Sequence, residues 1–91
     1  MNDTELILQQ LVALLYRTNE HNWSESLQSL MLELKGSSNE VDRNLIKSQL
    51  RGIFGGMGSF SDLILFKNGK ILIDENNELD SLRQALYQSL I

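Results

Sequence analysis

The dipeptide Asn68-Gly69, which stands between two apolar runs, constrains the fold of this chain more than any other feature. Asn-Gly is the strongest signal for a two-residue hairpin turn, because both central positions must adopt positive φ. The sequence therefore predicts a β-hairpin with strands at about residues 60–66 and 70–74. In the expected register Phe66 lies beside Ile71, Ile64 beside Ile73, and Lys67 opposite Lys70.

Two segments before the hairpin carry apolar residues at helical spacing. In residues 3–19 these residues cover an arc of roughly 200°, so we expect this helix to contact neighbours on two sides. Asn22 and Glu25 have the spacing of a capping box, which predicts the start of a second helix. Gly36 is expected to end that helix, because glycine tolerates a left-handed conformation.

A third helix is predicted from Ser37 and Glu40, which repeat the capping-box spacing. After the hairpin, Asn76 or Asn77 is expected to cap a last helix with a narrow seam of leucines. Two strands alone are marginally stable in water, so the hairpin must lie on the helices or pair with another copy. We predict a single domain over residues 1–91 with an α+β fold, in the order ααα-ββ-α.

The charge balance narrows the classes of partner. A net charge of -4 at pH 7 disfavours binding to nucleic acid or to an anionic membrane, and suits a basic or amphipathic partner better. The chain has no cysteine, so nothing indicates an oxidising compartment. Asp3 and Glu5 stand where a signal peptide carries Lys or Arg, and the apolar run after them is too short for a membrane span. We expect a cytoplasmic protein of bacterial type.

Glycine is concentrated between the expected third helix and the hairpin, in the run "GGMGSF". Loops that bind phosphate follow a strand and open a helix, whereas this run follows a helix and leads into a strand. We therefore interpret Gly55, Gly56 and Gly58 as a helix end and a tight turn, not as a ligand cradle.

A row of basic residues on the expected third helix, a basic ridge, suggests an alternative function, the binding of an anion. Arg43, Lys47 and Arg51 recur every four residues, which aligns them on one face of the third helix and points the ridge toward the glycines. Such a ridge can hold a phosphate-like anion, although cations also favour helix C-termini without any ligand. The candidate interaction or anion surface comprises Arg43, Lys47, Arg51, Gly55, Gly56, Gly58, Ser59 and Asp62.

No residue pattern predicts catalysis, a metal site or a cofactor. An EF-hand loop begun at Asp74 would need glycine at position 79 and glutamate at 85, but Leu79 and Ala85 stand there. His21 is a single loop histidine with no identifiable nucleophile to activate. We expect no catalytic residue and no enzyme activity.

The stretch "FGGMGSFSDLIL", followed by "NELDSLRQALY", resembles small bacterial domains of unknown function. The resemblance covers about residues 51–88 and implies a glycine run, a strand and a final helix, with no assigned activity. The matching residues are Gly55, Gly56, Met57, Gly58, Ser59, Phe60, Asp62, Leu79, Leu82, Arg83, Leu86 and Tyr87.

Asp62 is the unusual residue of the expected first strand, since a carboxylate among apolar neighbours is costly to bury unless it is paired. We expect Arg83, Arg51 or the amides of residues 56–59 to bind it and so fix the turn. The alternative role is a contact with a partner.

These observations favour a non-enzymatic domain that acts by contact with another protein, as a regulatory or immunity-type partner, over an anion-binding module. A homodimer through the hairpin edge or the first helix is the other expected assembly. Lys67 and Lys70 argue against pairing of strand edges, because charged edge residues discourage it.

Overall fold

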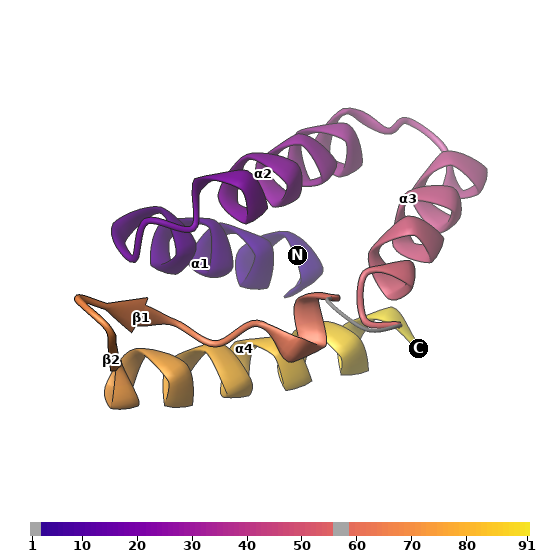
Figure 1. Ribbon diagram of the computed structural model, residues 1–91. Helices are drawn as coiled ribbons and strands as arrows, with labels where there is room; N and C mark the ends of the chain where they lie inside the picture. Colours follow the sequence, from indigo (N-terminus) through magenta and orange to yellow (C-terminus); the bar gives the residue numbers. More distant parts are fainter. Residues whose placement is uncertain (1–2, 56–58) are drawn as a thin grey trace.

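A computed structural model describes residues 3–55 and 59–91. Figure 1 shows three helices, a short hairpin and a long final helix, so the predicted α+β class and the order ααα-ββ-α are confirmed. The helices are α1 (Asp3–Arg17), α2 (His21–Gly36), α3 (Glu40–Gly52) and α4 (Ile73–Leu90), with a 3-10 helix η1 (Phe60–Asp62) and strands β1 (Phe66–Lys67) and β2 (Lys70–Ile71).

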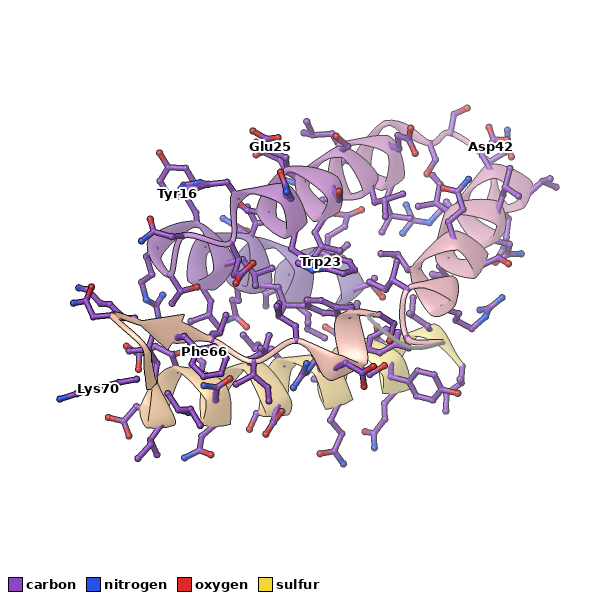
Figure 2. The ribbon with its side chains drawn as sticks, in the orientation of Figure 1. Tyr16, Trp23, Glu25, Asp42, Phe66 and Lys70 are labelled. Carbon is purple, nitrogen blue, oxygen red and sulfur yellow. The ribbon has the colours of Figure 1, made fainter. Side chains whose placement is uncertain are left out.

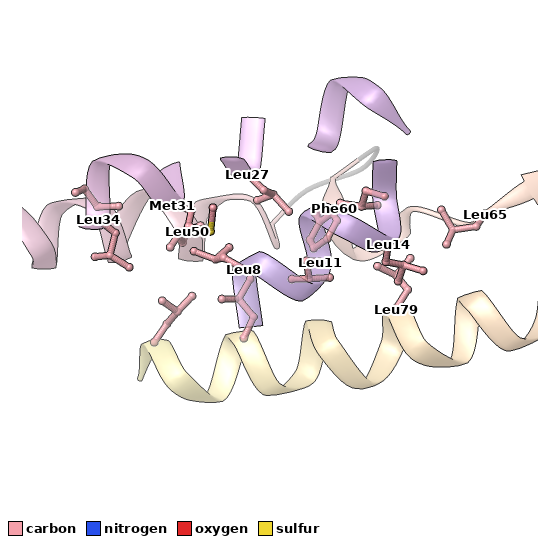
Figure 3. Close-up of a cluster of buried hydrophobic side chains, with 14 residues drawn as sticks. Leu8, Leu11, Leu14, Leu27, Met31, Leu34, Leu50, Phe60, Leu65 and Leu79 are labelled. Atoms are coloured by element: carbon pink, nitrogen blue, oxygen red, sulfur yellow. The ribbon is translucent and has the colours of Figure 1, made fainter. Parts of the chain in front are cut away.

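α1 lies between α2 and α4, and α3 packs against both of these helices (Figure 1). The predicted two-sided contact of the first helix is therefore confirmed. Leucines supply most of the buried side chains, and Phe60 of η1 completes the interior (Figure 3). The core comprises Leu8, Leu11, Leu14, Leu15, Leu27, Met31, Leu34, Ile46, Leu50, Phe60, Leu65, Leu79, Leu86 and Leu90.

The predicted N-cap of α2 is wrong, whereas Gly36 ends the helix as predicted but without the expected left-handed conformation. The helix begins at His21, so Asn22 lies inside it, and Glu20 occupies the N-cap without a side-chain bond. The preceding turn is made at Asn19, whose φ of 66° lies in the left-handed region that asparagine tolerates. Gly36 is the last helical residue, and the chain leaves the helix through an extended Ser37 instead of a left-handed glycine.

The start of α3 also differs from the prediction. Asn39 is the N-cap, because its side chain accepts a hydrogen bond from the amide of Asp42 at 2.9 Å. Ser37 serves the preceding helix, since its hydroxyl donates to the carbonyl of Leu34 at 2.6 Å. A serine just before a helix thus donates to a carbonyl at the end of the helix before it, where intrahelical partners run out.

The hairpin register is confirmed where the two strands pair. Phe66 lies opposite Ile71 and Lys67 opposite Lys70. Asn68 and Gly69 adopt the expected positive φ, at 53° and 77°.

The strands are shorter than predicted, and the expected pairing of Ile64 with Ile73 is wrong. Ile73 is already the first residue of α4, three or four residues before the predicted caps Asn76 and Asn77. The Asn76 side chain bonds the main chain of Leu65 instead, through both its amide and its carbonyl oxygen at 2.9 Å. These two hydrogen bonds attach the residue before β1 to the first turn of α4.

The first half of the predicted strand forms a 3-10 turn. Ser59, Ser61 and Asp62 surround Phe60 with polar groups that can bond to the local main chain, and such groups compete with a strand ladder. The amide of Asp62 donates to the carbonyl of Ser59 at 3.0 Å, and the amide of Phe60 donates to that of Ile53 at 2.9 Å. The turn places the Phe60 ring in the core.

Candidate functional site

The predicted basic ridge on α3 binds the ends of two other helices. Arg43 donates through Nη1 to the carbonyl of Leu34, at the C-terminal end of α2, at 3.2 Å. The same nitrogen lies 3.7 Å from a carboxylate oxygen of Glu5 on α1. Arg51 donates to the carbonyl of Leu90, at the end of α4, at 2.8 Å.

These contacts give the ridge a structural role. The carbonyls at a helix C-terminus carry partial negative charge, so a guanidinium that binds them both satisfies the main chain and opposes the helix dipole. Lys47, between the two arginines, is half-buried. Two of the three predicted cations are therefore engaged with the protein itself.

The glycine run lies partly outside the described residues, because Gly56 and Gly58 fall in the undescribed segment. The amide of Gly55 donates to the carbonyl of Gly52 at 3.4 Å, continuing the turn that ends α3. The Ser59 hydroxyl shares a hydrogen bond of 3.1 Å with that of Ser61. Gly55 thus has the turn-forming role that was predicted for it.

Asp62 ends η1 and is exposed, so its predicted position within the first strand is wrong. It lines a shallow groove of about 350 Å³ together with Ser59, Trp23 and Ile64. The structure therefore brings two of the predicted site residues together, Ser59 and Asp62. The residues that line this groove do not include the arginines or the lysine of the ridge.

Arg83 of α4 is the most extensively bonded cation at this end of the chain. Its Nη1 donates to the carbonyls of Phe60 at 2.7 Å and Leu63 at 3.0 Å, and its Nη2 pairs with Asp80. Arg83 was one of the groups predicted to bind the Asp62 carboxylate, whereas these bonds go to two main-chain carbonyls beside Asp62 and to Asp80.

Aromatic rings gather beside Arg83. Phe60 contacts Trp23 with ring centroids 5.0 Å apart, and Phe54 contacts Phe60 and Tyr87 edge-on at 6.0 and 5.5 Å. Phe54 and Tyr87 also line a groove of about 460 Å³ with Arg83. Arg83 thus attaches η1 to α4 through Phe60, and Phe54 links the Phe60 ring to Tyr87 on the same helix.

The other side chains considered for chemistry have structural contacts. His21 packs edge-on against Tyr16, with centroids 5.0 Å apart. Glu78 pairs with Arg17 at 3.0 Å. Within residues 3–55 and 59–91, no group of three or more His, Asp or Glu side chains is placed to hold a metal ion. In the same ranges, no helix combines the length and the apolar character needed to cross a membrane.

Four large apolar side chains remain exposed around the hairpin, and they define what we call the hairpin surface. Phe66 and Ile71, which pair across the strands, are 52% and 57% exposed. Figure 2 shows Phe66 and Lys70 on this end of the molecule. The sequence did not predict this exposure, because the hairpin was expected either to lie on the helices or to pair with another copy. The hairpin surface comprises Ile64, Phe66, Ile71 and Ile73.

A family model for a domain of unknown function, DUF6966, matches residues 17–73, which include α2, α3 and the hairpin. Searches of curated proteins and of solved structures each returned no match. The family match overlaps the resemblance seen in the sequence and ends where α4 begins. The chain belongs to the DUF6966 family, a domain of unknown function.

Proposed function

We propose that this chain is a non-enzymatic bacterial domain that acts by contact with another protein, as a regulatory or immunity-type partner, and that the hairpin surface makes the contact. The observation that supports this most is the exposure of Phe66 and Ile71 side by side on paired strands. Ile64, which lines a groove with Phe66, and Ile73, two residues after Ile71, are also exposed. Apolar side chains that are grouped in this way, rather than scattered, are typical of a protein interaction site.

The charges of the hairpin favour a partner with acidic groups. Lys67 and Lys70 are directly opposite each other and both exposed, and like charges in this arrangement repel. Carboxylates from a partner would relieve that repulsion, whereas a second copy joined edge to edge would bring four lysines together. We therefore propose a different protein whose contact surface combines apolar and acidic residues, in the cytoplasm.

The glycine run has a structural part in this proposal. The main chain that follows it turns through η1, where Phe60 enters the core and Arg83 donates to the carbonyls of Phe60 and Leu63. That attachment supports the segment that leads into Ile64 and Phe66. Anion binding receives less support, because Arg43 and Arg51 already donate to helix ends.

Affinity capture from a native cell extract, with mass spectrometry, tests the proposal. Tagged wild-type protein is compared with Phe66→Gln and with Leu6→Gln, a control on α1 that is also about half exposed, at 49%. We expect a reproducible protein partner that Phe66→Gln loses and Leu6→Gln keeps. Loss of about tenfold in affinity is expected for removing a well-packed interface aromatic.

Light scattering on the purified protein separates the two assemblies. A monomer at micromolar concentration agrees with a different partner, whereas a dimer that Phe66→Gln dissociates would replace the proposal with self-association. Capture of the same proteins by the wild type and by Phe66→Gln would also contradict the role of the hairpin surface.

A further inference from the structure

A third groove lies between α2 and α3, outside the hairpin surface. Its volume is about 510 Å³. Gly36 and Ser37 line it where α2 ends, and Leu45, Ile46 and Gln49 line it along α3. Ile46 is a buried core residue, so the floor of the groove is the outer layer of the hydrophobic core. The groove is thus apolar at its base and supported by packed side chains.

Exposed apolar side chains border this groove on both helices. Leu45 is 61% exposed, and Val41, one turn earlier on the same face of α3, is 78% exposed. Leu32 is exposed one turn before Gly36 on α2. The row from Val41 through Leu45 to Gln49 runs for about 12 Å along α3, at the rise of an α-helix. That length suits about two turns of a second helix laid beside it.

The charged residues of the groove are carboxylates. Glu33 lines it from α2 and Asp42 from α3, and among the described lining residues there is no lysine or arginine. The Asn39 side chain, 3.1 Å from the Asp42 carboxylate, donates to it and orients it. Arg43 lies near the end of the groove, with its Nη1 3.5 Å from the Ser37 hydroxyl, but the ion pair described for it is with Glu5 on α1.

We propose that the groove between α2 and α3 binds an amphipathic, basic helix of a partner protein. The apolar face of that helix packs on Leu45 and Ile46, and its lysines or arginines lie beside Glu33 and Asp42. An apolar floor with acidic sides is the arrangement by which grooves select basic amphipathic helices. The inference shares with the proposed function the premise of protein contact, but it concerns a different surface and a partner of opposite charge.

A designed peptide provides the probe. A blocked leucine-lysine peptide of about 14 residues forms roughly four helical turns with one apolar and one basic face. It is titrated into ¹⁵N-labelled protein and followed by NMR, with calorimetry for affinity. A leucine-glutamate peptide of the same pattern and a scrambled leucine-lysine peptide are the controls. We expect amide shifts to concentrate on α2 and α3 around Glu33, Gly36 and Leu45, with neither control peptide binding there.

Two variants of exposed residues test the site. Leu45→Gln is expected to weaken the peptide about tenfold through lost apolar contact, and Glu33→Gln a few-fold through lost charge pairing. Phe66→Gln and Leu6→Gln, which lie elsewhere, are expected to bind like the wild type. Circular dichroism checks that each variant is folded.

Several results would overturn the inference. These are no binding of the leucine-lysine peptide, equal binding by the wild type and Leu45→Gln, or shifts confined to the hairpin. A concentration-dependent oligomer that Leu45→Gln dissociates would instead assign the groove to a second copy. Loss of the captured partner in Phe66→Gln with normal peptide binding would separate the hairpin surface from this groove.

Discussion

Arg83 lies over the ring of Phe60, with its Cζ atom 5.8 Å from the ring centroid, and its Nη1 donates to the carbonyl of the same residue at 2.7 Å. One side chain of α4 therefore holds both the ring and the main chain of η1. Because the side chain of Arg83 is only 13% exposed, removing it leaves these groups in a partly dry environment. The attachment of η1 to α4 is expected to depend on this residue.

Replacing Arg83 with methionine tests that dependence. Arg83→Met keeps the length of the side chain but removes the guanidinium bonds to the carbonyls of Phe60 and Leu63, which is expected to lower the unfolding free energy by about 2 kcal/mol. The unfolding free energy of Arg83→Lys should lie between those of the wild type and Arg83→Met, since lysine keeps the positive charge but lacks the forked set of donors. Urea unfolding followed by Trp23 fluorescence measures the change.

The matched control for Arg83 is Arg17, an exposed arginine paired with Glu78. Exposed ion pairs contribute little, so Arg17→Met is expected to change stability by less than about 0.5 kcal/mol. Equal effects of Arg17→Met and Arg83→Met would show that the contact with Phe60 is unimportant.

Asn76 is expected to be the polar residue on which the hairpin depends most. Its amide nitrogen donates to the carbonyls of Leu65 and Leu72, at 2.9 and 2.7 Å. Asn76→Asp replaces that donor with an oxygen facing two carbonyls, and should lower stability by about 2 kcal/mol. Thermal unfolding, together with the NMR shift of the Leu65 amide, reports the loss.

Asn77→Asp is the control for the added charge, since it stands in the same turn of α4 and is exposed. A negative charge near a helix N-terminus is favourable by about 0.5 kcal/mol, so this variant should be neutral or slightly stabilised. Equal melting temperatures for Asn76→Asp and Asn77→Asp would show that the hydrogen bonds of Asn76 contribute little to stability.

Two glycines are expected to respond to alanine in opposite directions. Gly69 has a φ of 77°, so Gly69→Ala is strained in the turn and should lower stability by about 1 kcal/mol. Gly52 lies in the last turn of α3 with no atom near the site of an added methyl group, and Gly52→Ala should raise stability by up to about 0.5 kcal/mol. Differential scanning calorimetry of both variants checks the signs, and a stable Gly69→Ala would contradict the turn geometry.

Substitutions of two cations of the basic ridge, Arg51 and Lys47, are expected to differ in their effect on stability. Arg51→Gln removes the donor to Leu90 and should lower stability by about 1 kcal/mol. Lys47→Gln should change it by less than about 0.5 kcal/mol, as most surface substitutions do. Chemical denaturation gives both values, and phosphate titration by NMR tests the remaining anion hypothesis: shifts at Gly55 and Ser59 that Lys47→Gln abolishes would restore it.

The hydrophobic periodicity and the turn residues predicted most of the fold. Asn68-Gly69 fixed the register of Phe66 with Ile71, because few residues accept two successive positive φ angles. The wide apolar arc of the first helix correctly indicated two neighbours, since side chains such as Leu8 and Leu15 must all be buried.

Helix ends and the first strand were predicted less well, because they depend on contacts between distant residues. Ser37 and Asn76 have the local spacing of caps, yet Ser37 bonds back to Leu34 of the preceding helix and Asn76 bonds Leu65, eleven residues earlier. Phe60 was expected to begin a strand, but its burial beside Trp23 and Arg83 decides its conformation. The roles of Arg43 and Arg51 were equally invisible, since a sequence does not show which carbonyls lie across from a helix face.

The hydroxyl of Thr4 donates to that of Ser89 at 2.9 Å, across a separation of 85 residues. α1 packs on α4 as well as on α2. Leucines near the start of the described chain are therefore buried partly against residues near its other end. During synthesis the ribosome must therefore release almost the whole of this sequence before α1 can be enclosed. Until then, the nascent protein presents an uncovered leucine face, the kind of surface that chaperones bind.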